Sequence, residues 1–244
     1  MDEMMHVDEL VEKLCTYCDA YELDVDEEVA RRCVEHFMLV VETNKVMNLT
    51  RITNEHDGLV LHILDSLLLL PEVRSAPYGM LLDIGTGAGY PGIPLTLATG
   101  RPSVLIDSVA KKVKAVAGFF DEMQIKDAKV SSERVESYAR EYRASCTCVV
   151  ARAVAALPVL IEYASPLLAW GGSLVVTKGV PSEEEISAGL YAASLCGFEF
   201  GSVRHVTLPD GLGDRTILRF DKLHDAKLGL PRKVGVAKKH PLGA

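Results

Sequence analysis

The 244-residue sequence lacks the features that would place a protein in a membrane or export it. Its longest apolar run, around residues 67–71, is far shorter than the roughly 20 residues that cross a bilayer as a helix. The first residues are acidic, whereas a secretory signal begins with positive charge. We therefore expect a soluble protein of the cytoplasm that has no membrane partner.

Cysteine occurs six times, but in no pattern typical of disulfide bonds or of a metal site. Cys15-x-x-Cys18 is half of a zinc or redox motif; zinc would need a second ligand pair, and a redox pair would need a βαβ unit beside it. Cys146 and Cys148 are spaced like residues on one strand. We interpret all six as reduced, buried thiols and expect no metal.

The formal net charge of −8 hides two segments of opposite sign. Residues 1–30 hold 11 acidic residues and one lysine, a charge of −10, so the other 214 residues together carry +2. The last 23 residues, from Lys222, hold six Lys or Arg and one Asp, a charge of +5. The average charge therefore does not exclude nucleic acid as a partner.

A glycine-rich turn follows an apolar run at residues 81–84. The run is typical of a buried parallel strand. Gly85, Gly87 and Gly89 then stand at alternate positions, where backbone can lie against a ligand, and two prolines in 91–94 suit the first turn of a helix. Strand, glycine turn and helix together open a nucleotide-binding α/β fold.

Two kinds of nucleotide fit this turn. Gly87, Gly89 and Gly92 match the G-x-G-x-x-G pattern of dinucleotide-binding proteins, which is weak evidence by itself. Asp83 favours S-adenosylmethionine, because an acid there can orient the ligand-facing backbone and hold an amino group, whereas it would repel a pyrophosphate. A turn without any ligand is the third interpretation.

The carboxylate of Asp107 ends the next apolar run, 22 residues after Gly85. This is the spacing at which an acid reaches ribose hydroxyls. Asp107 can also cap a helix that starts at Val109, and the two roles are compatible.

The chain as a whole predicts helices first and then alternating strands and helices. Helical periodicity extends to about residue 75, with an apolar face over 29–41 and a second helix over 59–70. Strands are expected near 80–84, 103–107, 128–131, 147–151 and 173–178, with the clearest helices at 110–123, 158–168 and 183–195. Two last runs, 198–207 and 215–220, flank a Pro-Asp-Gly turn and form an antiparallel hairpin.

This pattern predicts an α/β, Rossmann-like sheet of seven mostly parallel strands, as in class I methyltransferases, rather than a dinucleotide fold. The predicted organisation is a helical extension at 1–75, a methyltransferase core at 76–222 and a basic tail at 223–244.

His62, Asp65 and Ser66 stand at i, i+3 and i+4 of the second predicted helix, so they share one face. That face is directed to water or to a ligand cavity, and the spacing alone leaves both open. Upstream, Asn48-Leu-Thr50 indicates a tight turn between helices.

Several motifs occur together in one order along residues 40–244: Asn48-Leu-Thr50, His62-x-x-Asp65-Ser66, Leu82 to Pro94, Arg134-Val-Glu136, Arg152-Ala-Val-Ala, Thr177-Lys-Gly179, Pro231-Arg-Lys and Lys238-Lys-His-Pro241. In these motifs the chain resembles the GidB family, the small-subunit ribosomal RNA methyltransferase G, which methylates guanine N7 in bacterial 16S rRNA. Tyr90 departs mildly from the family, which often has Phe or Leu there.

The resemblance implies that the chain is an enzyme with S-adenosylmethionine as its cofactor. It implies a cofactor site at Gly85, Tyr90, Val135, Glu136 and Arg152, to which the turn adds Gly87 and Gly89, and the second strand adds Asp107. Val135 and Glu136 would sandwich and hydrogen-bond adenine, and Arg152 suits a carboxylate or phosphate.

Candidates for catalysis are few. The segment 151–154 lacks the Pro-Pro-aromatic motif of amine methyltransferases, and Cys148 is inside a strand, not at the place of a cytosine-C5 nucleophile. Guanine N7 already has a free lone pair and needs no base, so no residue is assigned as catalytic. Lys178, His62 and Asp65 are candidates for positioning the substrate; Lys178 could steady guanine O6 or a phosphate, or simply cap its strand.

The basic tail mixes Arg232, Lys233, Lys238 and Lys239 with glycine and proline, which favours an extended segment that follows RNA phosphates. A solvated tail without a ligand is the alternative. We expect a monomer that acts on 16S ribosomal RNA or a small-subunit particle. Methylation of another RNA or of a small molecule, and RNA binding without catalysis, are the alternative functions.

Overall fold

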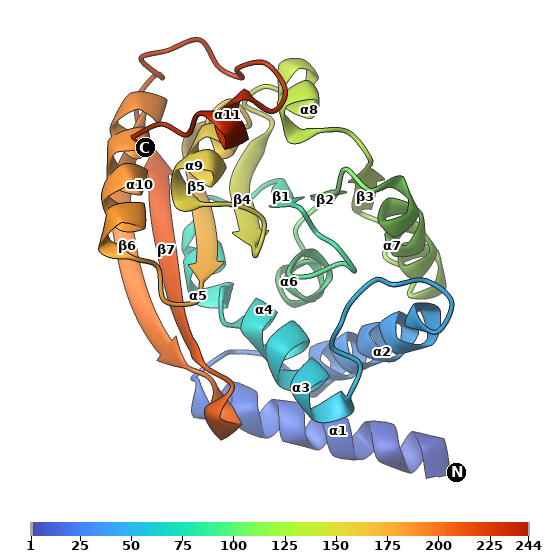
Figure 1. The fold of residues 1–244 in the computed structure, drawn as a ribbon. Helices are drawn as coiled ribbons and strands as arrows, with labels where there is room; N and C mark the ends of the chain where they lie inside the picture. Colours follow the sequence, from blue (N-terminus) through green and yellow to red (C-terminus); the bar gives the residue numbers. More distant parts are fainter. Residues whose placement is uncertain (1, 244) are drawn as a thin grey trace.

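The computed structural model describes residues 2–243, and its centre is a seven-stranded sheet (Figure 1). The strand order is β3-β2-β1-β4-β5-β7-β6. Strands β1 to β5 are parallel, and β7 runs antiparallel between β5 and β6. The predicted fold class is therefore confirmed. The strands are β1 Leu81–Ile84, β2 Ser103–Ile106, β3 Ala128–Ser131, β4 Cys146–Arg152, β5 Leu168–Lys178, β6 Phe198–Thr207 and β7 Asp214–Lys222.

Helices cover both faces of this sheet and enclose two hydrophobic cores. The first core holds the predicted N-terminal helices, α6 and α7: α1 Asp2–Ala20, α2 Glu27–Asn44, α3 Glu55–Gly58, α4 Asp65–Leu67, α5 Leu70–Ser75, α6 Gly92–Thr99 and α7 Ala110–Glu122. The second core holds α8 Val135–Glu141, α9 Leu157–Ala164, α10 Glu183–Cys196 and α11 Val236–Lys239.

Alternation along the strands divides the apolar side chains between the cores. In β4, Cys148 and Val150 join the first core, and Val149 and Ala151 join the second. Because both faces are covered at the centre of the sheet, the central strands β1 and β4 are largely apolar and buried. All six cysteines are unpaired thiols, five of them buried and Cys15 half-buried. None of the described helices is long and apolar enough to span a bilayer.

Two helix predictions need correction. The segment predicted as one helix over 59–70 contains a π-helical turn at Leu59–Leu64, in which the Asp65 amide donates to the Val60 carbonyl, and the helix is interrupted before α5. The helix predicted over 158–168 ends at Ala164 because β5 begins at Leu168, before an irregularity in its pairing with β4.

The basic tail is docked on the core rather than extended, which corrects the sequence prediction. The Gly235 amide donates to Glu136 Oε1 at 2.8 Å, and Arg232 Nε donates to Glu162 Oε1 at 2.7 Å. Ala237 of the short helix α11 is fully buried. These contacts bring the tail next to α8 and α9 (Figure 1). Lys238 thereby lines a cavity with Ile84 and Ile106, the last residues of β1 and β2.

The N-terminal helices reach the far end of the β6–β7 hairpin. Tyr17 Oη donates to Asp210 Oδ2 at 2.9 Å, and Tyr21 Oη donates to the Thr207 carbonyl at 2.6 Å. His56 contacts the same Asp210 carboxylate at 2.8 Å. These contacts therefore attach the tip of the β6–β7 hairpin to the N-terminal helical region.

Candidate functional site

Two cavities meet at the carboxyl ends of the parallel strands, where α/β folds bind their ligands. They share Gly85, Gly87, Lys112 and Ala153. The upper cavity, about 230 Å³, is lined by Ile84, Gly85, Gly87, Ile106, Asp107, Ser108, Lys112, Glu133, Arg134, Val135, Glu136, Ala153, Val154, Tyr163 and Lys238. The lower cavity, about 520 Å³, is lined by Leu49, Thr50, Ile52, Leu61, His62, Asp65, Gly85, Thr86, Gly87, Ala88, Tyr90, Lys112, Arg152, Ala153, Thr177, Lys178, Gly179 and Arg215.

Gly85, Gly87 and Gly89 all have positive φ, at 75°, 61° and 98°, but their structural roles differ. A Cβ on Gly85 would lie 2.5 Å from Val154, and one on Gly89 would lie 2.6 Å from Ile93, so both glycines permit close packing. A Cβ on Gly87 would meet nothing within 4 Å. Gly87 thus presents bare backbone where the two cavities join.

Asp83 lies behind the turn rather than in a cavity. Its side chain is fully buried, and Oδ2 accepts a hydrogen bond from the Gly92 amide at 2.9 Å. Burial raises the pKa of this carboxyl to about 7. The structure supports the predicted orienting role of Asp83, but not the predicted contact with a ligand amino group.

Asp107 makes two hydrogen bonds to backbone. Oδ1 accepts from the Val109 amide at 2.9 Å, just before α7. Oδ2 accepts from the Gly87 amide at 3.1 Å, and the carboxylate lines the upper cavity. The predicted capping role is wrong, because the N-cap of α7 is Val109, which makes no side-chain cap bond, and Asp107 instead holds the turn before the helix. The ribose contact stays a prediction.

Val135 and Glu136 also line the upper cavity, as the prediction requires. Glu136 is only 4% exposed, however, and its Oε1 accepts from Gly235 of the tail. Its carboxylate therefore helps to hold the tail beside the cavity. Lys238 is the one tail cation that lines either cavity among the described residues.

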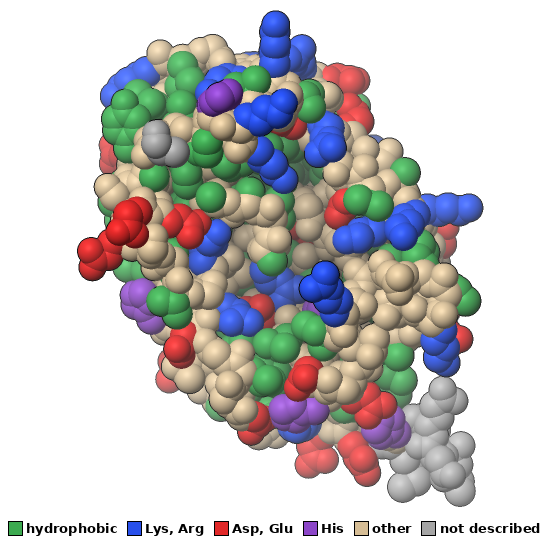
Figure 2. Space-filling model, viewed as in Figure 1, with side chains coloured by type: hydrophobic (Ala, Val, Ile, Leu, Met, Phe, Trp, Pro, Cys, Tyr) green, Lys and Arg blue, Asp and Glu red, His purple; other side chains and the backbone are tan. Residues whose placement is uncertain are grey.

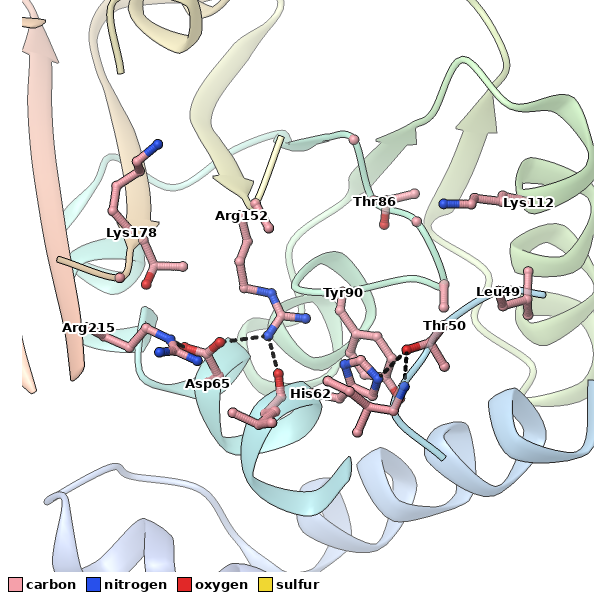
Figure 3. A pocket seen from close by; sticks show the side chains of 18 residues that line it. Leu49, Thr50, His62, Asp65, Thr86, Tyr90, Lys112, Arg152, Lys178 and Arg215 are labelled. Atoms are coloured by element: carbon pink, nitrogen blue, oxygen red, sulfur yellow. Dashed lines mark hydrogen bonds and ion pairs between the residues drawn. The ribbon is translucent and has the colours of Figure 1, made fainter. Parts of the chain in front are cut away.

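The lower cavity contains a carboxylate bridged by two arginines (Figure 3). Asp65 Oδ2 accepts from Arg152 Nη1 at 2.9 Å, and Asp65 Oδ1 accepts from Arg215 Nε at 2.9 Å. Arg152 Nη1 also donates to the Leu61 carbonyl at 2.6 Å. Asp65 is 4% exposed, so the bridge is a buried element of the cavity wall.

Arg215 was not predicted as a site residue, although the predicted antiparallel hairpin was enough to place it near the site. Strand β7 is antiparallel to β5, so its first residues pair beside the last residues of β5. Thr216 pairs with Lys178, which places Arg215 at the same edge of the sheet as Arg152. This placement follows from the strand order and not from any local motif.

Aromatic rings form the right-hand wall of the cavity in Figure 3. The rings of His62 and Tyr90 are stacked, with centroids 4.6 Å apart and planes 6° apart. His36, from α2, packs on the other side of Tyr90 and contacts the Ala88 carbonyl at 3.0 Å. Burial, together with the charge of Arg152, lowers the pKa of His62 to about 4, so this imidazole is neutral near pH 7.

The polar face predicted for the second helix is only partly a cavity wall. His62 and Asp65 line the lower cavity, and His62 Nε2 contacts Thr50 Oγ1 at 2.9 Å. Ser66 is fully buried and donates to the His62 carbonyl instead. Ser66 therefore lies outside the lower cavity, whereas His62 and Asp65 line it.

The remaining predicted cations are only partly available to a ligand. Lys178 lines the lower cavity, but its Nζ contacts the Ala155 carbonyl at 2.9 Å and Glu185 Oε1 at 2.8 Å. Arg232 is paired with Glu162. Lys233 and Lys239 are exposed and lie outside both cavities.

The cavities fit a cofactor that is a nucleoside at one end and an amino acid at the other. The upper one combines the Asp107 carboxylate with the apolar Ile106 and Val135, which suits ribose and adenine. At the junction, Gly87 leaves space, and the buried Thr86 Oγ1 has no hydrogen-bond partner among the described residues. Strand order, glycine turn and joined cavities define a class I S-adenosylmethionine-dependent methyltransferase.

Solved structures share this fold at low sequence identity. Geranyl diphosphate methyltransferase, solved in complex with SAM, has a TM-score of 0.51 and 14% identity, and the match covers 66% of this chain and 85% of that one. The [4+2]-cyclase SpnF has a TM-score of 0.55 and 15% identity, with 66% and 81% covered. Because one neighbour is described as a cyclase, the fold alone does not establish the reaction.

Sequence comparison narrows the class to one family. The GidB model, described as rRNA small subunit methyltransferase G, matches residues 30–215. The ribosomal RNA small subunit methyltransferase G of Desulfitobacterium hafniense is 37% identical over 206 residues, 83% of this chain and 85% of that protein. The protein of the same description from Carboxydothermus hydrogenoformans is 33% identical over 233 residues, 94% and 99% of the two chains. The chain belongs to the GidB family of rRNA small subunit methyltransferases.

Proposed function

We propose that this enzyme transfers a methyl group from S-adenosylmethionine to N7 of a guanine in 16S ribosomal RNA. Family membership supports the RNA substrate. The observation that carries the choice of atom is the lower cavity, which adjoins the glycine turn, is rich in cations and offers no free base. We further propose that the enzyme works as a monomer in the cytoplasm, where ribosomal RNA is found.

The cofactor would lie across both cavities. Asp107 and Val135 of the upper cavity would hold its nucleoside end, with the tail lysine Lys238 beside them. Gly85 and Gly87, which belong to both cavities, would border its centre. The acceptor guanine then occupies the part of the lower cavity between the His62–Tyr90 stack and the arginine bridge.

Side chains in the lower cavity support transfer to an atom that needs no deprotonation. Asp65 is the only carboxylate that lines it among the described residues, and both its oxygens accept from arginines. His62 has a pKa of about 4 and is a poor base. The cofactor supplies a methyl group on sulfonium, so what remains for the protein is alignment, which contributes at most about 7–11 kcal/mol.

Charge is conserved in this transfer: the bond from sulfur to the methyl group breaks, the N7 bond forms, and the positive charge moves to the base. Arg152 and Arg215 serve as hydrogen-bond donors and take no part in the bond changes. The cavity therefore receives neutral guanine and releases a cationic base.

Labelled methyl transfer tests the proposal directly. The enzyme is incubated with labelled cofactor and either 16S rRNA or small ribosomal subunits, and the modified base is located by chain cleavage at N7-methylguanine. We expect label at one guanine. Label at an exocyclic amine or at C5 of cytosine, or transfer to a small molecule only, would identify another methyltransferase. RNA binding without transfer would indicate a non-catalytic module.

A further inference from the structure

Guanine and adenine both carry N7, so methylation at N7 does not by itself select guanine. The two purines differ at position 6, where guanine has a carbonyl acceptor and adenine has an amino donor. A cavity that accepts guanine alone must therefore direct a hydrogen-bond donor to position 6. The question is which group of the lower cavity does this.

We propose that Arg215, held in place by Asp65, is the residue that recognises O6 of the acceptor guanine. The proposal rests on the proposed function and adds the source of its base specificity. Arg215 lies near the start of β7. Its side chain lines the lower cavity and is 18% exposed. It is the guanidinium on the far side of Arg152 from the Tyr90 wall (Figure 3).

The hydrogen bonds of Arg215 leave a donor available. Nε donates to Asp65 Oδ1 at 2.9 Å, and Nη1 donates to the Asp214 carbonyl at 2.9 Å. Nη2 has no partner among the described residues. The first two bonds fix the plane of the guanidinium, so the direction of the remaining donor is set before the base arrives.

Arg152 is less suited to this role. Both of its hydrogen bonds are donated by Nη1, to Asp65 and to the Leu61 carbonyl, so its Nε and Nη2 also have no partner among the described residues. Its guanidinium, however, lies over the Tyr90 ring, 5.7 Å from the centroid. We therefore assign Arg152 to joining the helical extension to the turn, and Arg215 to reading the base.

Asp65 excludes adenine as well as orienting Arg215. An amino group at position 6 would need an acceptor, and both oxygens of this carboxylate already accept from the arginines. The amino group would instead face guanidinium N–H groups, donor against donor. A base contact of this kind discriminates by about 1–3 kcal/mol, roughly 5- to 150-fold.

Base analogues test this assignment on the unmodified enzyme. The mapped guanine is replaced in 16S rRNA, assembled by ligation of a synthetic segment, with inosine or with 2,6-diaminopurine. Inosine keeps O6 and N7, whereas 2,6-diaminopurine keeps N7 and the 2-amino group but carries an amino group at position 6. We expect kcat/KM for inosine within about 5-fold of guanine, and a loss of about 100-fold for 2,6-diaminopurine. Rejection of inosine with acceptance of 2,6-diaminopurine would overturn the proposal.

Two variants then assign the discrimination to a side chain. Arg215→Gln should lower the rate with guanine and reduce the preference for guanine over 2,6-diaminopurine by at least about 10-fold, since an amide can accept as well as donate. Arg219→Gln is the matched control: it lies on the same strand and pairs with Asp221 and Ser75 outside the lower cavity. Its preference ratio should not change.

The outcomes separate the two proposals. If the unmodified enzyme transfers no methyl group to a guanine, the proposed function fails. If it does, and Arg215→Gln keeps the original preference ratio, only the role of Arg215 is wrong. Should Arg215→Gln not fold, Arg215→Lys keeps the charge but not the fixed fork of donors, and the same ratio decides.

Discussion

The acidic head, residues 1–30, and the basic tail, residues 223–243, both pack on the core, but by different means. The head buries apolar side chains such as Leu10, Leu14 and Cys18, while its acidic side chains from Asp8 to Glu28 are exposed. The tail buries less apolar surface and is held by hydrogen bonds to Glu136 and Glu162. Charged side chains in the head make exposed contacts, such as the Asp26 cap of α2 and the Asp8–Arg31 pair, whereas those in the tail reach buried carboxylates.

The two segments also lie on opposite sides of the cavities. The head crosses the bottom of the molecule, and the tail covers the top (Figure 1). In Figure 2, Lys and Arg side chains surround the hollow and its upper rim, while Asp and Glu gather along the lower edge. We therefore expect RNA to approach from the side of the tail rather than from the side of the head.

Deletion of the tail after Lys222 should have the largest effect. The deletion removes Lys238 from the upper cavity and leaves the buried Glu136 and Glu162 without their partners. We expect cofactor affinity to fall by more than about 100-fold, which corresponds to about 2.7 kcal/mol. Calorimetric titration with S-adenosylhomocysteine measures this; unchanged affinity would show that the tail serves RNA alone.

Arg232→Ala should destabilise the fold by about 2–3 kcal/mol, because it leaves the Glu162 carboxylate, 2% exposed, without its ion-pair partner. Chemical denaturation measures the change. Lys239→Ala, in the same tail but exposed, is the control and should change stability by less than about 0.5 kcal/mol. If Arg232→Ala changed the free energy of unfolding as little as Lys239→Ala, Arg232 would be a solvated cation without a structural role.

Reversal of the exposed charges in the tail should weaken RNA binding without changing the affinity for the cofactor. For Lys233→Glu with Lys239→Glu we expect a KM for RNA that rises several-fold. The salt dependence of RNA binding should become flatter by about 0.7–0.9 for each phosphate that these lysines neutralise in the unmodified enzyme. Cofactor affinity should not change, because neither lysine lines a cavity. Glu9→Lys with Glu12→Lys, in the head, is the comparison and should not raise KM.

The attachment of α3 to the hairpin tip, through His56 and Asp210, should weaken as pH rises. Hydrogen bonds to Asp210, and then to Asp57, raise the pKa of His56 above its ordinary value of 6.5. The contribution of this ion pair is therefore complete below about pH 6.5 and is lost as pH rises through the raised pKa.

The pair is exposed, so we expect an effect of no more than about 0.5 kcal/mol. The free energy of unfolding of the wild type and of His56→Gln, measured from pH 6 to pH 9, should converge at the upper end. A constant difference across this range would rule out the ion pair as its cause.

Strands and the glycine turn were predictable because their signals are local. A strand buried on both faces needs an apolar run, and β1 lies at 81–84, within the predicted 80–84. The left-handed backbone at Gly85, Gly87 and Gly89 needs residues without a Cβ. Asp107 was found by spacing alone, because the distance from turn to second strand is set by one helix.

The contacts that complete the site could not be predicted in the same way. Arg215 reaches Asp65 across 150 residues, and Gly235 reaches Glu136 across 99. No local pattern encodes which helix the tail will lie against, or that the helix will be interrupted by a π-helical turn at Leu59–Leu64. Composition indicated only that the tail was basic, so it did not predict that Arg232 also anchors the tail to Glu162.

Attachment of the tail has a consequence for the order in which the enzyme matures. Every strand of the sheet lies before residue 223, so the chain leaves the ribosome with its whole sheet ahead of the tail. N-terminal parts of a chain fold first during synthesis. The nascent protein can therefore form its glycine turn and cores while the upper cavity still lacks Lys238 and the bond from Gly235. If Lys238 contributes to cofactor binding as we expect, the cofactor binds at full affinity only after the tail has been synthesised.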